Sequence, residues 1–129
     1  MQLLTPVSPG ELLDKLTILD IKSERITDAQ KLANVQHERR LLENVWRQSG
    51  LENDQIVRLR ADLKAVNEKL WHIEDAIRDE ERAGRFGERF IELARSVYVT
   101  NDERAALKKA INQTLGSKIV EEKSYQEYR

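Results

Sequence analysis

The sequence predicts an all-α protein: an antiparallel bundle of about five helices with one long central helix over about residues 54–82. Two observations carry this prediction. Apolar residues from Ile56 to Ile77 recur at alternating spacings of three and four, which is the periodicity of one helical face. Charged residues make up 35% of the chain and aromatic residues only 5%, a composition typical of solvent-exposed helices.

The first helix is expected to begin at Ser8 and to run to about residue 26. Pro9 and Glu11 follow Ser8 in the arrangement of a capping box with proline in the first turn. The residues that this helix is expected to bury are Leu12, Leu16, Leu19 and Ile26.

A second helix is expected to begin at Thr27 or Asp28 and to end at Gly50. Its apolar stripe is interrupted at Arg39, where the helical period calls for another apolar residue. The expected stripe consists of Leu32, Val35, Leu42 and Val45.

The third helix is expected to begin after an Asn53 cap and to end near Gly84, which suits the left-handed conformation of a helix stop. The joint before it is short, which favours antiparallel packing of the second helix against the third.

A short fourth helix is expected after Gly87, with apolar residues up to Val97. Thr100-Asn101-Asp102-Glu103 has the form of another capping box and predicts a separate fifth helix that ends at Gly116. Residues 117–129 are mostly charged and are expected to form a loosely packed tail.

Length and composition narrow the protein class. The 129 residues favour one domain, 1–129. The 22 basic and 23 acidic residues nearly cancel, so nucleic acid is not the expected partner. The absence of cysteine excludes disulfides, thiolate metal sites and cysteine nucleophiles. With neither a signal-peptide pattern nor a membrane-spanning apolar run, the expected location is the cytoplasm.

Several stretches together resemble a small uncharacterised bacterial protein family over essentially the full length of the chain. The resemblance implies no activity, substrate or catalytic residue, and it slightly favours sugar or envelope-glycan metabolism through an association with glycosyltransferase genes. The stretches that carry it are 6–12 (PVSPGEL), 14–19 (DKLTIL), 66–67 (VN), 70–71 (LW), 73–75 (IED), 93–95 (LAR), 101–102 (ND) and 121–125 (EEKSY).

No residue pattern predicts a metal site, a cofactor or a catalytic nucleophile. His37 and His72 are too far apart along the expected hairpin to share an ion, and structural or surface roles are expected for both. The acidic run from Glu74 to Glu81 spreads around its helix, which favours a solvated or ion-paired face over a metal site.

A polar edge beside the central stripe is the best candidate for a binding site. Trp71, Glu74 and Arg78 stack at helical spacing, and an arginine near a tryptophan and a carboxylate suits recognition of carboxylates or phosphates. Cations of the first, fourth and fifth helices are expected to approach this edge. The candidate ligand-binding residues are Lys15, Lys22, Asn67, Trp71, Glu74, Arg78, Arg95, Tyr98, Arg104 and Lys108. The alternative is that these cations only neutralise the acidic run.

Three functions remain open at this point. The first is a binding module for a small anionic ligand of the sugar-phosphate or nucleotide-sugar type, as a monomer or homodimer. The second is a cofactor-free enzyme that clamps a small anionic substrate between arginine and lysine side chains, as the helical chorismate mutases do. The third is a structural or adaptor protein that oligomerises through the Ile56–Ile77 stripe.

Overall fold

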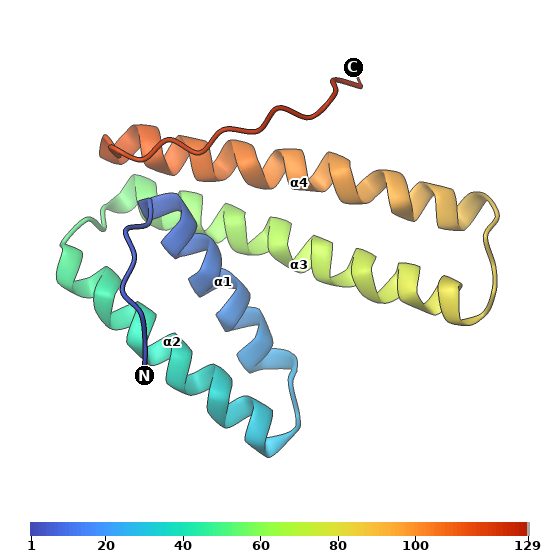
Figure 1. Ribbon diagram of the computed structural model, residues 1–129, viewed down its shortest axis with the longest axis horizontal. Helices are drawn as coiled ribbons and strands as arrows, with labels where there is room; N and C mark the ends of the chain where they lie inside the picture. Colours follow the sequence, from blue (N-terminus) through green and yellow to red (C-terminus); the bar gives the residue numbers. More distant parts are fainter. Residues whose placement is uncertain (129) are drawn as a thin grey trace.

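The computed structural model describes residues 1–128, and every regular element in that range is an α-helix (Figure 1). α1 spans Pro9–Arg25, α2 spans Ala29–Ser49, α3 spans Asp54–Arg82 and α4 spans Glu88–Leu115. The prediction of an all-α fold with a long helix over residues 54–82 is therefore confirmed.

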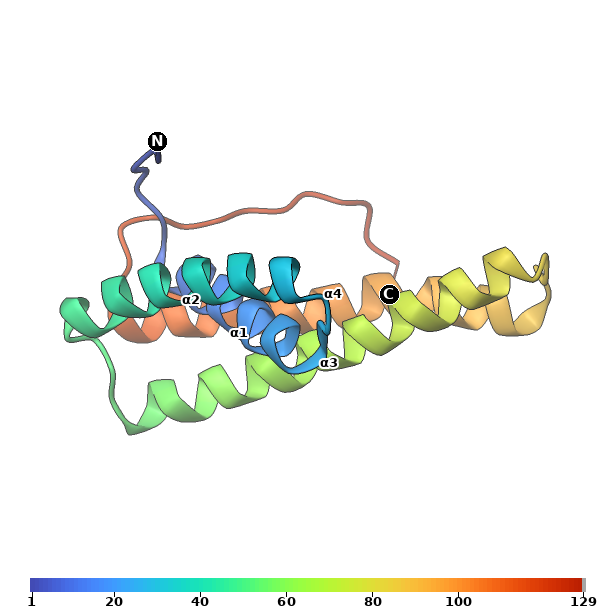
Figure 2. The same ribbon diagram turned by 90° about the horizontal axis from the view of Figure 1, so that it is seen from below.

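The helices form two pairs, α1 with α2 and α3 with α4, and α1 also packs against both members of the second pair. α3 packs along α4, while α1 packs against α2, α3 and α4 (Figure 2). The predicted pairing of the second helix with the third is wrong, because within residues 1–128 α2 packs on α1 and meets α3 through long side chains such as Arg60 on Glu43. α1 is consequently a central helix that is covered on several sides.

Local signals fix where the helices begin and end. Ser8, Asp28 and Asn53 are the N-caps of α1, α2 and α3, and each accepts a hydrogen bond from the backbone N–H three residues further on. Gly50 and Gly116 end α2 and α4 in the left-handed conformation, which glycine adopts at little cost.

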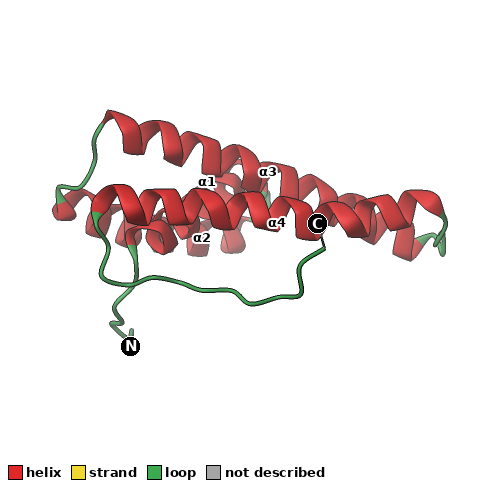
Figure 3. Ribbon diagram, turned by 90° about the horizontal axis from the view of Figure 1, so that it is seen from above, coloured by secondary structure: helices red, strands yellow, loops and turns green. Residues whose placement is uncertain are grey.

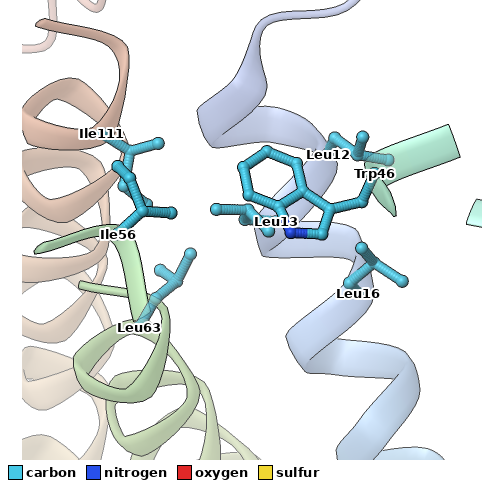
Figure 4. Packing of buried hydrophobic residues seen from close by; sticks show 7 residues of the cluster. All are labelled: Leu12, Leu13, Leu16, Trp46, Ile56, Leu63 and Ile111. Atoms are coloured by element: carbon cyan, nitrogen blue, oxygen red, sulfur yellow. The ribbon is translucent and has the colours of Figure 1, made fainter. Parts of the chain in front are cut away.

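The apolar core lies where α1 crosses the other helices (Figure 4). Leu13 of α1 lies between Trp46 of α2 on one side and Ile56 and Ile111 of the α3–α4 pair on the other. The buried members of this core are Leu12, Leu13, Leu16, Trp46, Ile56, Leu63 and Ile111. The Ile56–Ile77 stripe thus contributes its buried members to contacts within the chain.

The predicted break between a fourth and a fifth helix is absent, and Glu88–Leu115 is one continuous helix. The apolar faces of the two expected helices are in phase, at spacings of four, three, four, three and four through Leu93, Val97, Thr100, Arg104, Leu107 and Ile111. Thr100 is fully buried on this stripe instead of capping a helix. No glycine or proline interrupts the segment, so α4 continues alongside α3.

The buried stripe of α2 differs from the predicted one by one position. Val45 is exposed and Trp46 is buried, so the stripe follows Val35, Arg39, Leu42 and Trp46. Arg39, which interrupts the apolar pattern, lies on this inner face and donates from Nε to Asp20 Oδ1 of α1 at 2.7 Å. Ile26, expected in the first helix, is the C-cap that follows α1 and is only half-buried. Within α1, Leu13, Thr17 and Ile21 are buried in addition to the expected leucines.

Two parts of the chain extend from this core. The far end of the α3–α4 pair projects beyond α1 and α2 (Figure 1). The tail, residues 117–128, has no regular structure and runs beside α4 (Figure 3). Arg129, the last residue of the predicted tail, lies outside the described residues. In the described range none of the helices combines the length and apolarity that crossing a membrane requires.

Candidate functional site

A buried polar group lies where α1 meets α3 and α4. Asp14 is only 1% exposed, and Arg104 of α4 bonds both of its carboxylate oxygens, from Nε to Oδ1 at 2.9 Å and from Nη2 to Oδ2. Asn67 Nδ2 of α3 donates to Asp14 Oδ1 and to Thr17 Oγ1, both at 2.9 Å, and Thr17 Oγ1 donates to the Asp14 carbonyl at 2.8 Å. These four residues, called the Asp14 cluster, tie three helices together with charge-assisted bonds.

The electrostatics of the cluster keep Asp14 ionised. Burial by itself would raise the pKa of the Asp14 carboxyl, because the charged form loses hydration. The hydrogen bonds from Arg104 and Asn67, with the charges of Arg104 and Lys108, outweigh burial and hold this pKa below its ordinary value. The hydrogen bond to Asp14 in turn raises the pKa of Arg104.

A second polar group surrounds the beginning of α1. Lys108 Nζ of α4 lies 2.6 Å from Glu11 Oε2 and 3.0 Å from Oε2 of Glu121 in the tail. Ser8 Oγ donates to Glu121 Oε1 at 2.7 Å and accepts from the Glu11 N–H at 3.1 Å. Burial would lower the pKa of Lys108, but hydrogen bonds with Glu11 and Glu121 overcome it and raise this pKa.

Close backbone contact brings these groups together. The Gly10 N–H donates to Asn112 Oδ1 at 2.7 Å, and a Cβ at Gly10 would lie 2.6 Å from the Lys108 carbonyl oxygen. Such a distance is well inside van der Waals contact. Because only glycine fits there, α1 approaches α4 closely enough for the Glu11–Lys108 and Asp14–Arg104 pairs to form.

A groove of about 710 Å³ lies between α4 and the tail, and we call it the tail groove. The charged residues that α4 contributes to its lining are all cations: Arg104, Lys108 and Lys109. The acids in the lining, Glu121 and Glu122, come from the tail. The amide side chains in the lining are Asn101, Asn112 and Gln113.

The structure brings three of the ten predicted site residues together. Asn67 and Arg104 share Asp14, and Lys108 lies one helical turn from Arg104 on the same wall of the groove. Arg104 and Lys108 are both half-buried, at 30% and 15% side-chain exposure. Asn67, which the sequence places at an open edge, is buried.

The other predicted residues lie apart from the tail groove. Glu74 and Arg78 form an ion pair with each other on α3, and Lys15 lies 3.9 Å from Glu11. Tyr98 packs edge-on against Tyr128, with ring centroids 4.8 Å apart, and lines a neighbouring hollow of about 910 Å³ under the end of the tail. Outside the lining of both hollows lie Lys22 and Trp71, which are half-buried, and Arg95, which is exposed.

Sequence reasoning missed Ser8, Glu11, Asp14, Thr17 and Glu121 as members of these groups. The sequence did contain a signal for Asp14 and Thr17, because α1 carries apolar residues on nearly every side. A helix that is apolar on all sides is buried in the fold, and the polar residues on it are then buried as well. No local pattern singles out Glu121, because its partners are Ser8, at the start of α1, and Lys108 of α4.

Acidic residues of the run on α3 form ion pairs with arginines a few positions further along the chain. Asp79 pairs with Arg82 at 2.6 Å, and Glu80 pairs with Arg85 at 2.7 Å. Over residues 1–128, three or more histidine, cysteine, aspartate or glutamate side chains do not gather as a metal site would require. His72 Nε2 lies 3.2 Å from an Arg25 nitrogen, and His37 is exposed.

Comparison with known proteins places the chain in a family of unknown function. Residues 3–128 match the sequence family described as a family of unknown function (DUF6165), so the chain belongs to that family. No curated protein and no solved structure matches the chain significantly.

Proposed function

We propose that this member of the DUF6165 family is a binding module for a small anionic ligand, and that the ligand binds in the tail groove. The single observation behind the proposal is the α4 wall of that groove, where the charged lining residues are Arg104, Lys108 and Lys109 and none is an acid. The neighbouring amide side chains would add neutral hydrogen-bond donors and acceptors around an anion.

The Asp14 cluster supports this function by fixing Arg104. Two N–H groups of its guanidinium bond Asp14, and a guanidinium carries five. The remaining donors belong to a side chain that lines the groove and that Asp14 holds in one orientation. Recognition of a carboxylate or phosphate gains from such preorganisation, because less side-chain freedom is lost on binding.

The ligand class is an anion with hydroxyl groups, of the sugar-phosphate or nucleotide-sugar type. The groove volume, about 710 Å³, falls in the range of small-molecule sites. Cations would meet the phosphate, while the amides of Asn101, Asn112 and Gln113 suit sugar hydroxyls.

A panel of sugar phosphates and nucleotide sugars, screened by thermal shift and then by calorimetry, tests the proposal. A ligand at 100 times its Kd should stabilise the protein by about 2.7 kcal/mol. Lys109→Ala should weaken binding, because Lys109 is exposed on the groove and forms no ion pair within residues 1–128. Lys118→Ala is the matched control, since Lys118 is an exposed lysine outside the lining. No shift across the panel, or equal losses in both variants, would contradict the proposal.

A further inference from the structure

The Glu121 carboxylate lies in a complete oxyanion site. One oxygen accepts a hydrogen bond from Ser8 Oγ at 2.7 Å, and the other lies 3.0 Å from Lys108 Nζ. The two donors belong to the N-cap of α1 and to the C-terminal third of α4, and Ser8 is 1% exposed. This pair of donors, called the Ser8–Lys108 site, is the kind of site that binds one end of a carboxylate or phosphate.

The carboxylate in this site comes from the least structured part of the chain. The tail is exposed along almost its whole length, and the Glu121 side chain is 41% exposed. Further along the tail, Lys123 Nζ and Tyr128 Oη each lie 2.5 Å from a carboxylate oxygen of Asp102, and the Tyr128 ring packs against Tyr98. The Lys123–Asp102 pair is exposed, and exposed ion pairs contribute little to stability.

The Ser8–Lys108 site also belongs to the tail groove. Lys108 and Glu121 both line the groove, so an anion that enters it would meet the Glu121 carboxylate and compete with it for Lys108. Burial would raise the pKa of Glu121, but Ser8 and Lys108 outweigh it and lower this pKa, so the site favours a charged occupant.

The buried hydroxyl makes an exchange of anions more favourable than simple opening. If the tail left and nothing replaced it, the Ser8 O–H would exchange its charge-assisted hydrogen bond to Glu121 for a weaker one to water. An incoming oxyanion restores that bond. Lys108 meanwhile keeps Glu11 as a partner at 2.6 Å in either state.

The geometry points to an internal competitor: Glu121 occupies the Ser8–Lys108 site in the free protein, and the carboxylate or phosphate group of the ligand displaces it and releases the tail. This inference rests on the proposed function and adds its regulation. The tail reports occupancy of the groove, because the Ser8 hydroxyl has one hydrogen to donate and ligand and tail cannot both accept it.

Glu121→Gln tests the exchange, with inorganic pyrophosphate as the probe. The variant removes the competing charge, so pyrophosphate should bind it more tightly than the wild type, by roughly tenfold if the tail occupies the site nine-tenths of the time. Glu122→Gln is the matched control, because Glu122 is the adjacent tail carboxylate in the same groove and makes no ion pair in the described range. It loses the same charge in the same groove without vacating the Ser8–Lys108 site, so its gain in affinity for pyrophosphate should be much smaller than that of Glu121→Gln.

Backbone NMR relaxation gives a second measurement that needs no variant. Adding pyrophosphate to the wild-type protein should increase the fast backbone motion of residues 117–123 and leave that of α1 unchanged. Equal affinities in Glu121→Gln and Glu122→Gln, with the tail unchanged on binding, would overturn the internal competitor and leave the proposed function in place. If pyrophosphate binds none of the three proteins, the competitor is overturned, and the ligand panel then decides the proposed function separately.

Discussion

Thr17 and Thr100 show how two identical buried side chains differ in what their hydroxyls do. Both are fully buried. The Thr17 hydroxyl donates to the Asp14 carbonyl and accepts from Asn67, whereas the Thr100 hydroxyl has no hydrogen-bond partner within residues 1–128. A buried hydroxyl without a partner has lost its hydration and gained nothing in return.

Thr100→Val should therefore stabilise the protein by about 1 kcal/mol, because valine has the same shape and no polar atom to bury. Thr17→Val should destabilise it by about 1–2 kcal/mol, because Asn67 then loses one of its two acceptors and keeps only Asp14. Urea unfolding of both variants beside the wild type measures the difference. Loss of stability in both variants would contradict the assignment.

At the scale of helices, the contact between α1 and α4 depends on a missing side chain. Gly10→Ala should destabilise the protein by about 2 kcal/mol, since its Cβ would meet the Lys108 carbonyl oxygen and α1 would have to move away. Gly87→Ala is the control, because nothing lies within 4 Å of a Cβ there, and its effect should stay below about 1 kcal/mol. Thermal unfolding measures both, and equal effects would contradict the steric explanation.

Helix ends were predictable from sequence where the signal is local, and helix continuity was not. Ser8 and Asn53 cap helices because their side chains reach the next turn, a property of four or five consecutive residues. Thr100 has the same local pattern, yet the buried stripe continues through it along α3. Comparing the phase of the apolar residues before and after Thr100 distinguishes a helix start from a helix interior.

At the scale of the whole molecule, the Asp14 cluster holds α1, α3 and α4 together and makes stability depend on pH. The pKa of Asp14 is below its ordinary value in the folded protein, so the ionised carboxylate favours folding. That contribution is complete above roughly pH 4, the range where a free aspartate ionises, and it is lost as the pH falls through the lower folded pKa.

Asp14→Asn should consequently cost about 3 kcal/mol at pH 7, near the lower end for breaking a buried pair, because Arg104 still reaches the groove. The difference from the wild type should shrink as the pH falls below roughly 4. Asp79→Asn, which removes an exposed pair with Arg82, should cost less than about 1 kcal/mol. Urea unfolding at several pH values checks this, and a constant Asp14→Asn penalty down to the acid limit would contradict it.

The candidate site was only partly predictable because its members meet across the whole fold. Arg104 and Lys108 were accessible to sequence reasoning as cations one turn apart on a helix. Their partners Asp14 and Glu121 come from opposite ends of the chain, and nothing in the sequence around either one specifies that the two ends meet. The central position of α1 decides this, and helical periodicity does not show which helix will be central.

The place of α1 also sets the order in which the protein can be completed after synthesis begins. Asp14 lies 90 residues before Arg104, and Glu11 lies 97 residues before Lys108. At about 5–20 residues per second, these partners leave the ribosome roughly 5–20 s after α1 does. During that interval α1 can pack against α2 and then against α3, but the Asp14 carboxylate still lacks its Arg104 partner. α1 is made before α2, α3 and α4, yet its surroundings are complete only once α4 has been synthesised with Arg104 and Lys108.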